Sequence, residues 1–153
     1  MSPLQQSLPQ EPDMGRVRGV MFDVDGCLVL SANPTGEDGA ALPGAAEAVA
    51  ALASAGLPFT VFTNASSRLP GAIAQELAHV GLDVREEQVL TPSVVAGRVL
   101  AERHPGGRVL AFGGDGLTVP LTRAGVELVD VDAALETGGE GVAAVVIGWD
   151  TSF

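Results

Sequence analysis

Short apolar runs alternate along the chain with longer segments that are rich in alanine or apolar on one face. The apolar runs predict buried strands at 17–23, 57–63, 89–91, 108–112, 126–129 and 143–147. The longer segments predict helices at 43–55, 69–80, 93–104 and 117–124. Residues 29–42 and 136–141 carry turn residues and predict loops. Strands and helices that alternate at these lengths predict α/β layers with parallel strands.

Proline and glycine mark the ends of the predicted helices. Pro43 stands at the start of the first predicted helix, and Gly56 and Gly81 follow the first and the second. The segment Pro105-Gly106-Gly107 ends the third helix, and a new strand begins directly after it. The chain therefore divides into an earlier and a later α/β part.

The first candidate for chemistry is Asp23-Val24-Asp25-Gly26, at the end of the first predicted strand. Ligands of open α/β sheets bind outside the carboxyl ends of the strands, so two carboxylates here face a crevice. One can attack or bind a metal ion while the other transfers protons. Gly26 allows a sharp turn and the close approach of a phosphate. A calcium loop of the D-x-D-x-D-G type is excluded because Cys27 and Leu28 occupy its last two positions.

The second candidate is Thr63-Asn64, at the end of the second predicted strand. A hydroxyl and adjacent backbone N–H groups at this position can hold phosphate oxygens. Thr-Asn is also a good turn sequence, so it becomes specific only together with the acidic motif. Ser66 and Ser67 come next, and we expect them to help start the following helix.

Charge narrows the possible ligands. The formal net charge is −11 and all eight basic residues are arginine, so the chain contains no lysine. Such a surface repels a nucleic-acid backbone, and a phosphate-handling site on it calls for a local cation. We expect no nucleic-acid partner and, since no run of about 18 apolar residues occurs, no membrane span. Residues 1–16 lack the features of a signal peptide, and they predict a flexible tail and a cytoplasmic location.

Three stretches of the sequence together resemble a known family. They read M-F-D-V-D-G-C-L, P-G-A-A-E-A and V-F-T-N-A-S. They resemble the haloacid dehalogenase superfamily of phosphohydrolases, and within it the NagD-like and nitrophenylphosphatase-like branch with an α/β cap. The stretch Q-V-L-T-P-S is similar to the point where that cap enters, and V-V-I-G-W-D echoes the cap.

The resemblance implies a Rossmann-like core in 17–92, of which the first three strands are present, followed by part of an α/β cap in 93–153. It implies a phosphatase that acts on small phosphorylated metabolites with Mg²⁺. Asp23 matches the nucleophile that forms an aspartyl-phosphate, and Asp25 matches the acid/base. Both match magnesium ligands, Asp23 through its side chain and Asp25 through its backbone carbonyl. Thr63 and the Asn64 backbone match the phosphate-binding groups.

The chain departs from the family pattern beyond the cap. The family needs a basic residue there, usually lysine, and a further acidic pair near a G-D motif. Gly114-Asp115 could be that motif in a capless relative, but no second acid follows within the next few residues, so we expect a cap turn there. We therefore expect an incomplete form whose first strand is an unpaired edge that invites aggregation or pairing with a partner, such as a complementing fragment. A homodimer that forms through the cap is also compatible with the sequence.

Two other interpretations stay open. The missing lysine and acidic pair favour a non-catalytic α/β module that binds a phosphorylated ligand or a protein partner. A receiver-like signalling domain is weaker, because such domains place the phosphate acceptor on a later strand. The identity of the phosphate ester is left open by the sequence.

Overall fold

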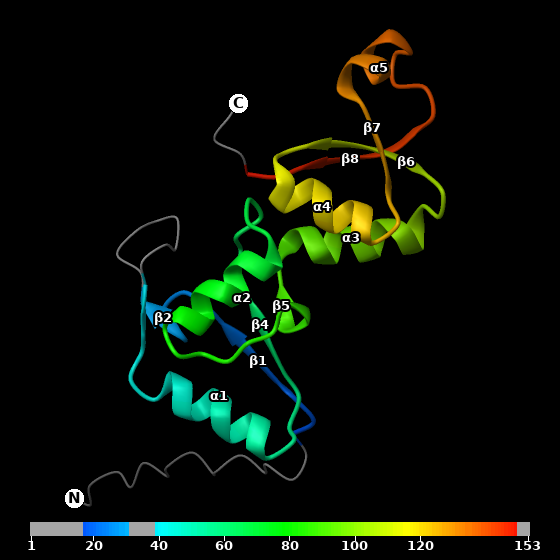
Figure 1. The fold of residues 1–153 in the computed structure, drawn as a ribbon. Coiled ribbons are helices and arrows are strands. Elements are labelled where there is room, and N and C mark those ends of the chain that lie inside the picture. Colours follow the sequence, from blue (N-terminus) through cyan, green and yellow to red (C-terminus); the bar gives the residue numbers. More distant parts are fainter. Residues whose placement is uncertain (1–16, 31–38, 150–153) are drawn as a thin grey trace, which may run out of the picture.

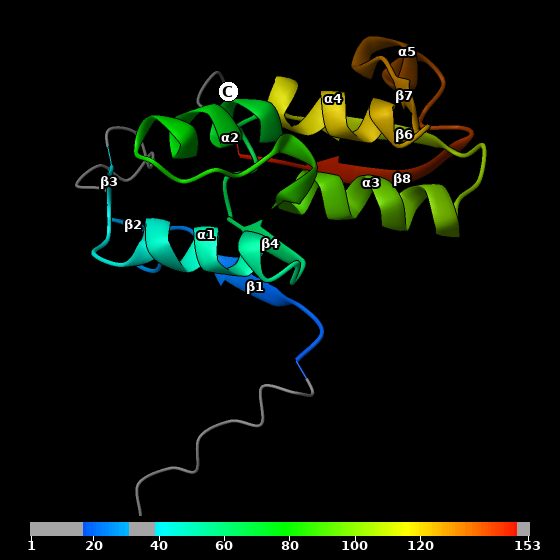
Figure 2. The same ribbon diagram turned by 60° about the horizontal axis from the view of Figure 1, so that its bottom comes forward.

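The computed structural model describes residues 17–30 and 39–149, which form two α/β units (Figure 1). The tail predicted for residues 1–16 lies outside this range. The first unit contains β1 (Val20–Asp23), β2 (Val29–Leu30), β3 (Ala40–Ala41), α1 (Ala45–Ser54), β4 (Phe59–Phe62), α2 (Pro70–His79), the short 3-10 helix η2 (Glu86–Gln88) and β5 (Val89–Leu90). The second unit contains α3 (Pro92–Arg103), β6 (Arg108–Phe112), α4 (Asp115–Arg123), β7 (Glu127–Val129), α5 (Val131–Glu136) and β8 (Val142–Ile147). Figure 2 shows the second unit to one side of the first.

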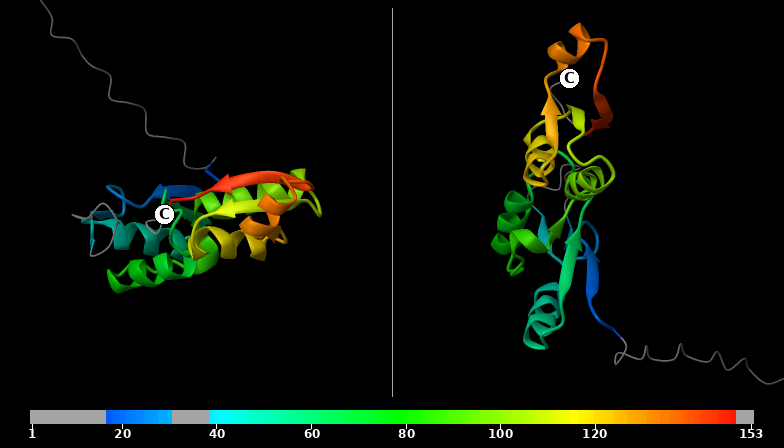
Figure 3. Two further views of the ribbon diagram at one scale, coloured as in Figure 1. Left: turned by 90° about the horizontal axis from the view of Figure 1, so that it is seen from above. Right: turned by 90° about the vertical axis from the view of Figure 1, so that its right-hand side faces the viewer.

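The first sheet has the order β1-β4-β5, and both pairings are parallel. Alternate residues of β4 are buried, because Phe59 and Val61 face the helices. Helices α1 and α2 cover this same face, as Figure 3 shows in its right-hand view. The core between them consists of the buried side chains of Val49, Phe59, Val61, Ile73, Leu77, Leu82 and Val89, among others. Burial of this apolar face is the main stabilising term of the unit.

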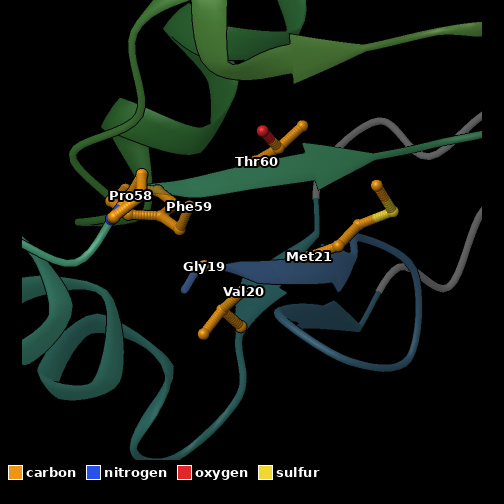
Figure 4. Close-up of a pocket in the computed structure, with 6 residues that line it drawn as sticks. All are labelled: Gly19, Val20, Met21, Pro58, Phe59 and Thr60. Atoms are coloured by element: carbon orange, nitrogen blue, oxygen red, sulfur yellow. The ribbon is translucent and has the colours of Figure 1, made fainter. Parts of the chain in front are cut away.

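The opposite face of the first sheet and its β1 edge are open in the described part of the chain. Met21 is 65% exposed, and among the described residues β1 has β4 as its only neighbour in this sheet. A shallow groove of about 310 Å³ lies here, and Figure 4 shows its lining, which is Gly19, Val20, Met21, Pro58, Phe59 and Thr60. The unpaired edge that the sequence predicts for the first strand is therefore present among the described residues.

The second sheet has the order β7-β6-β8 and is also parallel. Helices α3 and α4 pack against each other at Gly97, where a Cβ would lie 2.9 Å from that of Ala124. Val109, Leu117 and Leu121 are buried between these helices and the sheet. The outer positions of β8 stay exposed, since Val145 is 55% and Ile147 is 78% accessible.

The structure corrects two details of the sequence prediction. The predicted loop 29–42 begins and ends with paired strands, because Val29 and Leu30 pair antiparallel with Ala41 and Ala40. A further helix, α5, was missed, and the Asp130 carboxylate caps its start by accepting from the N–H groups of Asp132 and Ala133. Cys27 is exposed, because Val24 and Leu28 take the core positions of that turn.

No helix within residues 17–30 and 39–149 is long and apolar enough to cross a membrane.

Candidate active site

The loop after β1 presents both acidic side chains to solvent. Asp23 is the last residue of β1, and Asp23 and Asp25 are exposed. The turn from Val24 to Val29, which contains Asp25, is closed by local bonds, since the N–H groups of Leu28 and Val29 both donate to the Val24 carbonyl at 3.0 Å. Leu28, 2% exposed, anchors the turn in the core. The acids are therefore held at the strand end by contacts within their own loop.

Gly26 shapes this turn. Its φ is +79°, a conformation that side-chain-bearing residues rarely adopt, and a Cβ there would contact nothing within 4 Å. Its N–H donates to the Val29 carbonyl at 2.7 Å. In this arrangement that N–H is engaged in the turn, so the phosphate-binding role expected for Gly26 stays a prediction.

The loop after β4 lies beside the acidic turn. Asp23 is the register partner of Phe62, so Thr63 lies one residue beyond the paired position. Neighbouring strands lie about 4.8 Å apart, which brings the carboxyl ends of β1 and β4 together at one end of the sheet. Thr63 is 4% exposed and its N–H donates to the Leu90 carbonyl at 3.2 Å, whereas Asn64 is exposed. The structure thus brings together the strand ends that carry the residues predicted from the two motifs.

The oxygen atoms at this end of the sheet suit a hard cation such as Mg²⁺. Mg²⁺ binds oxygen, keeps several water ligands, and is held by one or two carboxylates together with substrate phosphate. The Asp23 and Asp25 carboxylates and the nearby backbone carbonyls are such ligands. Across the described ranges, no group of three or more acidic, histidine or cysteine side chains gathers in a metal-binding cluster. Asp115 therefore does not join the two acids; it lies in the first turn of α4, in the second unit.

The predicted role of Ser66 and Ser67 in starting α2 is wrong. The residue before the helix is Leu69, no side chain caps it, and Pro70 occupies the first turn, where its missing N–H costs nothing. The Ser66 hydroxyl instead accepts the Trp149 N–H at 3.1 Å. A bond between residues so distant in sequence leaves no local signal, so sequence reasoning could not find it.

A second missed residue is Arg68, whose side chain is 18% exposed. It lies in the same loop as Thr63 and Asn64 and forms an ion pair with Glu76 of α2. Arginine near a phosphate-binding loop could have been noted from the sequence, but its acidic partner depends on how the loop meets the helix.

The sequence is similar to those of known proteins over most of its length. The profile of haloacid dehalogenase-like hydrolases matches residues 20–127. Human chronophin is 36% identical over 146 residues, which cover 92% of this chain and 47% of chronophin. The chain thus spans about half the length of the curated relatives it matches.

The fold is also similar to those of solved structures. NagD from Escherichia coli K-12 superposes with a TM-score of 0.70 at 26% identity, over 90% of this chain and 48% of NagD. A candidate p-nitrophenyl phosphatase from Bacillus subtilis gives 0.71 at 26% identity, over 90% of this chain and 47% of that protein. With its acidic turn and Thr-Asn loop on adjacent parallel strands and its profile match over most of the sequence, this chain belongs to the haloacid dehalogenase-like hydrolases.

Proposed function

We propose that this chain carries the nucleophile half of a magnesium-dependent phosphomonoester hydrolase that acts on small phosphorylated metabolites. The observation that carries the proposal is the pairing of β1 with β4. Because Asp23 is the register partner of Phe62, the exposed Asp23 carboxylate ends its strand next to the Thr63-Asn64 loop. A nucleophile beside groups that can hold phosphate oxygens is the arrangement that phosphoryl transfer requires.

The chemistry depends on the two carboxylates. An Asp23 carboxylate oxygen attacks phosphorus, the P–O ester bond breaks, and Asp25 gives a proton to the leaving alkoxide. Water then attacks the phosphorus of the aspartyl-phosphate, Asp25 takes a proton from that water, and the Asp23 carboxylate and inorganic phosphate are released. The Thr63 hydroxyl and the Asn64 backbone hold the phosphoryl oxygens during both steps. Placement of these groups is most of the catalysis, because the transferred group needs little covalent help.

Magnesium would be held by the Asp23 side chain and the Asp25 backbone carbonyl, and it would offset the charges of phosphate and carboxylate. An offset of this kind is needed here, because the chain has a formal net charge of −11 and no lysine. We propose that the remaining acidic ligands and the basic residue come from outside the described residues. A second copy or a complementing fragment that pairs with the open β1 edge is the partner that we infer.

A second function is favoured by one observation. The described residues supply two acids and no third metal-binding side chain at the site. A non-catalytic module that binds a phosphorylated ligand at Thr63 and Asn64 would need no more than this.

The test is hydrolysis of p-nitrophenyl phosphate by the purified chain, with and without magnesium, beside Asp23→Asn. Asp83→Asn is the matched control, because Asp83 is also exposed but lies after α2, away from this sheet edge. Magnesium-dependent turnover that is lost in Asp23→Asn alone would support the hydrolase. Undiminished turnover in Asp23→Asn would overturn the assignment of the nucleophile. Phosphate-dependent thermal stabilisation without turnover would favour the binding module.

Two further assignments stay proposals. We propose that residues 93–153 are part of an α/β cap that covers the substrate site, and limited proteolysis near Thr91 would test whether they separate as a unit. We also propose a cytoplasmic location, which fractionation of cells that express a tagged chain would test.

A further inference from the structure

The loop after Thr63 and Asn64 is contacted by several elements of the second unit. The start of α3 reaches it through Ser93, whose hydroxyl donates to the Ser66 carbonyl at 3.3 Å. The segment after β8 reaches it through the Trp149 N–H, 3.1 Å from the Ser66 hydroxyl oxygen. The start of α4 reaches it at Gly116, where a Cβ would lie 2.1 Å from the Ser67 carbonyl carbon. The second unit therefore meets the first at 66–68, the residues next to the candidate phosphate-binding groups.

The groups that hold Ser66 are themselves fixed. Ser93 is 1% exposed, in the first turn of a helix that the Thr91 hydroxyl caps. The N–H of Gly148 donates to the Phe112 carbonyl at 2.8 Å, which ties the chain just before Trp149 to the end of β6. Both partners of Ser66 are thus bonded to other parts of the second unit, so the position of Ser66 depends on the position of that unit.

The same loop also supports Thr63. The Ala65 N–H donates to the Thr63 hydroxyl oxygen at 3.3 Å, and Ala65 directly precedes Ser66. A displacement of Ser66 therefore moves the backbone that contacts the Thr63 hydroxyl. Buried packing and hydrogen bonds transmit such a displacement because they have few alternative arrangements.

We propose that Ser66 is a positioning residue, which couples the placement of the second unit to the conformation of the Thr63-Asn64 loop. Its role in catalysis rests on the proposed phosphatase function. In that setting, the phosphate-binding groups adopt the conformation described here only while the second unit is docked on Ser66.

The test is amide hydrogen exchange of the full chain, measured residue by residue by NMR without any ligand. In Ser66→Ala, the exchange of the Trp149 and Ala65 amides is expected to rise about two- to tenfold, the range that one net hydrogen bond represents. Ser66→Thr keeps the hydroxyl acceptor and is expected to restore slow exchange at both amides. Ser67→Ala is the matched control, because the contact at Ser67 involves its backbone.

A rise that is confined to Trp149, or that appears equally in Ser67→Ala, would overturn the coupling. Should Ser66→Ala fold poorly, Ser93→Ala is the second variant. It removes the hydroxyl that donates to the Ser66 carbonyl and is expected to speed amide exchange at Ala65. No change at Ala65 in that variant would equally refute the proposal. Because these measurements need no substrate, they remain decisive even if the turnover test with Asp23→Asn excludes a phosphatase.

Discussion

The loops that leave β1 and β4 lie at the same end of the sheet, where both strands finish, but they are held in different ways. The loop after β1 is closed by bonds between near neighbours, such as those from Leu28 and Val29 to the Val24 carbonyl. The loop after β4 is held by contacts from residues 27 and 83 positions away along the chain, Ser93 and Trp149. The acidic turn is therefore encoded locally, whereas the candidate phosphate-binding loop depends on the second unit.

This difference explains why the acidic turn is easier to recognise from the sequence than the Thr63-Asn64 loop. A locally closed turn needs a fixed order of residue types, here a glycine at the positive φ of Gly26 and a buried leucine at Leu28. A loop that is held from elsewhere needs only the right atoms at the contact. The difference also predicts that substitutions near β1 act within one unit and that substitutions near 66–68 act between units.

The largest effect is expected where the local loop meets the core. Leu28→Ala removes a side chain that is 2% exposed and should lower the free energy of unfolding by about 2–5 kcal/mol. Urea unfolding monitored by circular dichroism measures this loss. Leu30→Ala is the control, because Leu30 is 63% exposed two residues later. Similar losses for both leucines would contradict the anchoring role of Leu28.

A smaller effect is expected at the contact between the units. Alanine at a helical glycine ordinarily stabilises by about 1 kcal/mol. At Gly116, however, the new Cβ would lie 2.1 Å from the Ser67 carbonyl carbon, where backbone must move. Gly116→Ala should therefore destabilise, by about 1–3 kcal/mol. The same urea unfolding decides the sign, with Thr122→Ala as the control on an exposed position of α4.

If Gly116→Ala proves stabilising, the two units are not in close contact at Gly116, and the loop after β4 is not held by the second unit there.

The smallest effect is expected from an ion pair that also joins the units but lies away from the loop. Arg123 pairs with Glu86, and the side chains are 63% and 47% exposed. An exposed pair contributes at most about 1 kcal/mol, so Arg123→Gln should change stability by less than that. Thermal unfolding at low and high salt measures this change in stability. Arg103→Gln, at an exposed position of α3, is the control. A loss as large as that of Gly116→Ala would show that surface charge, rather than the contact at 66–68, joins the units.

Most strands and helices of the described chain were predictable because each has a strong local signal. Strands β1, β4 and β6 are apolar runs, and α1 to α4 lie within two residues of their predicted bounds. The β2–β3 pairing was missed, because two-residue strands carry no period to detect. Helix α5 was missed because its six residues lie close to a glycine-rich stretch that reads as a loop.

By itself the sequence determined the α/β class and the acidic turn, because these depend on residue types a few positions apart. It marked Thr63-Asn64 as a candidate only by its place at the end of a predicted strand. The tertiary structure decided the rest. Pairing of β1 with β4 set the two motifs side by side and left Met21 exposed on the open face of the sheet. Packing of the second unit against the first brought the Trp149 N–H to the Ser66 hydroxyl, which therefore does not start a helix. The physical reason is distance along the chain, since neighbours within a few residues leave a pattern, whereas contacts across 83 residues exist only after the units have packed.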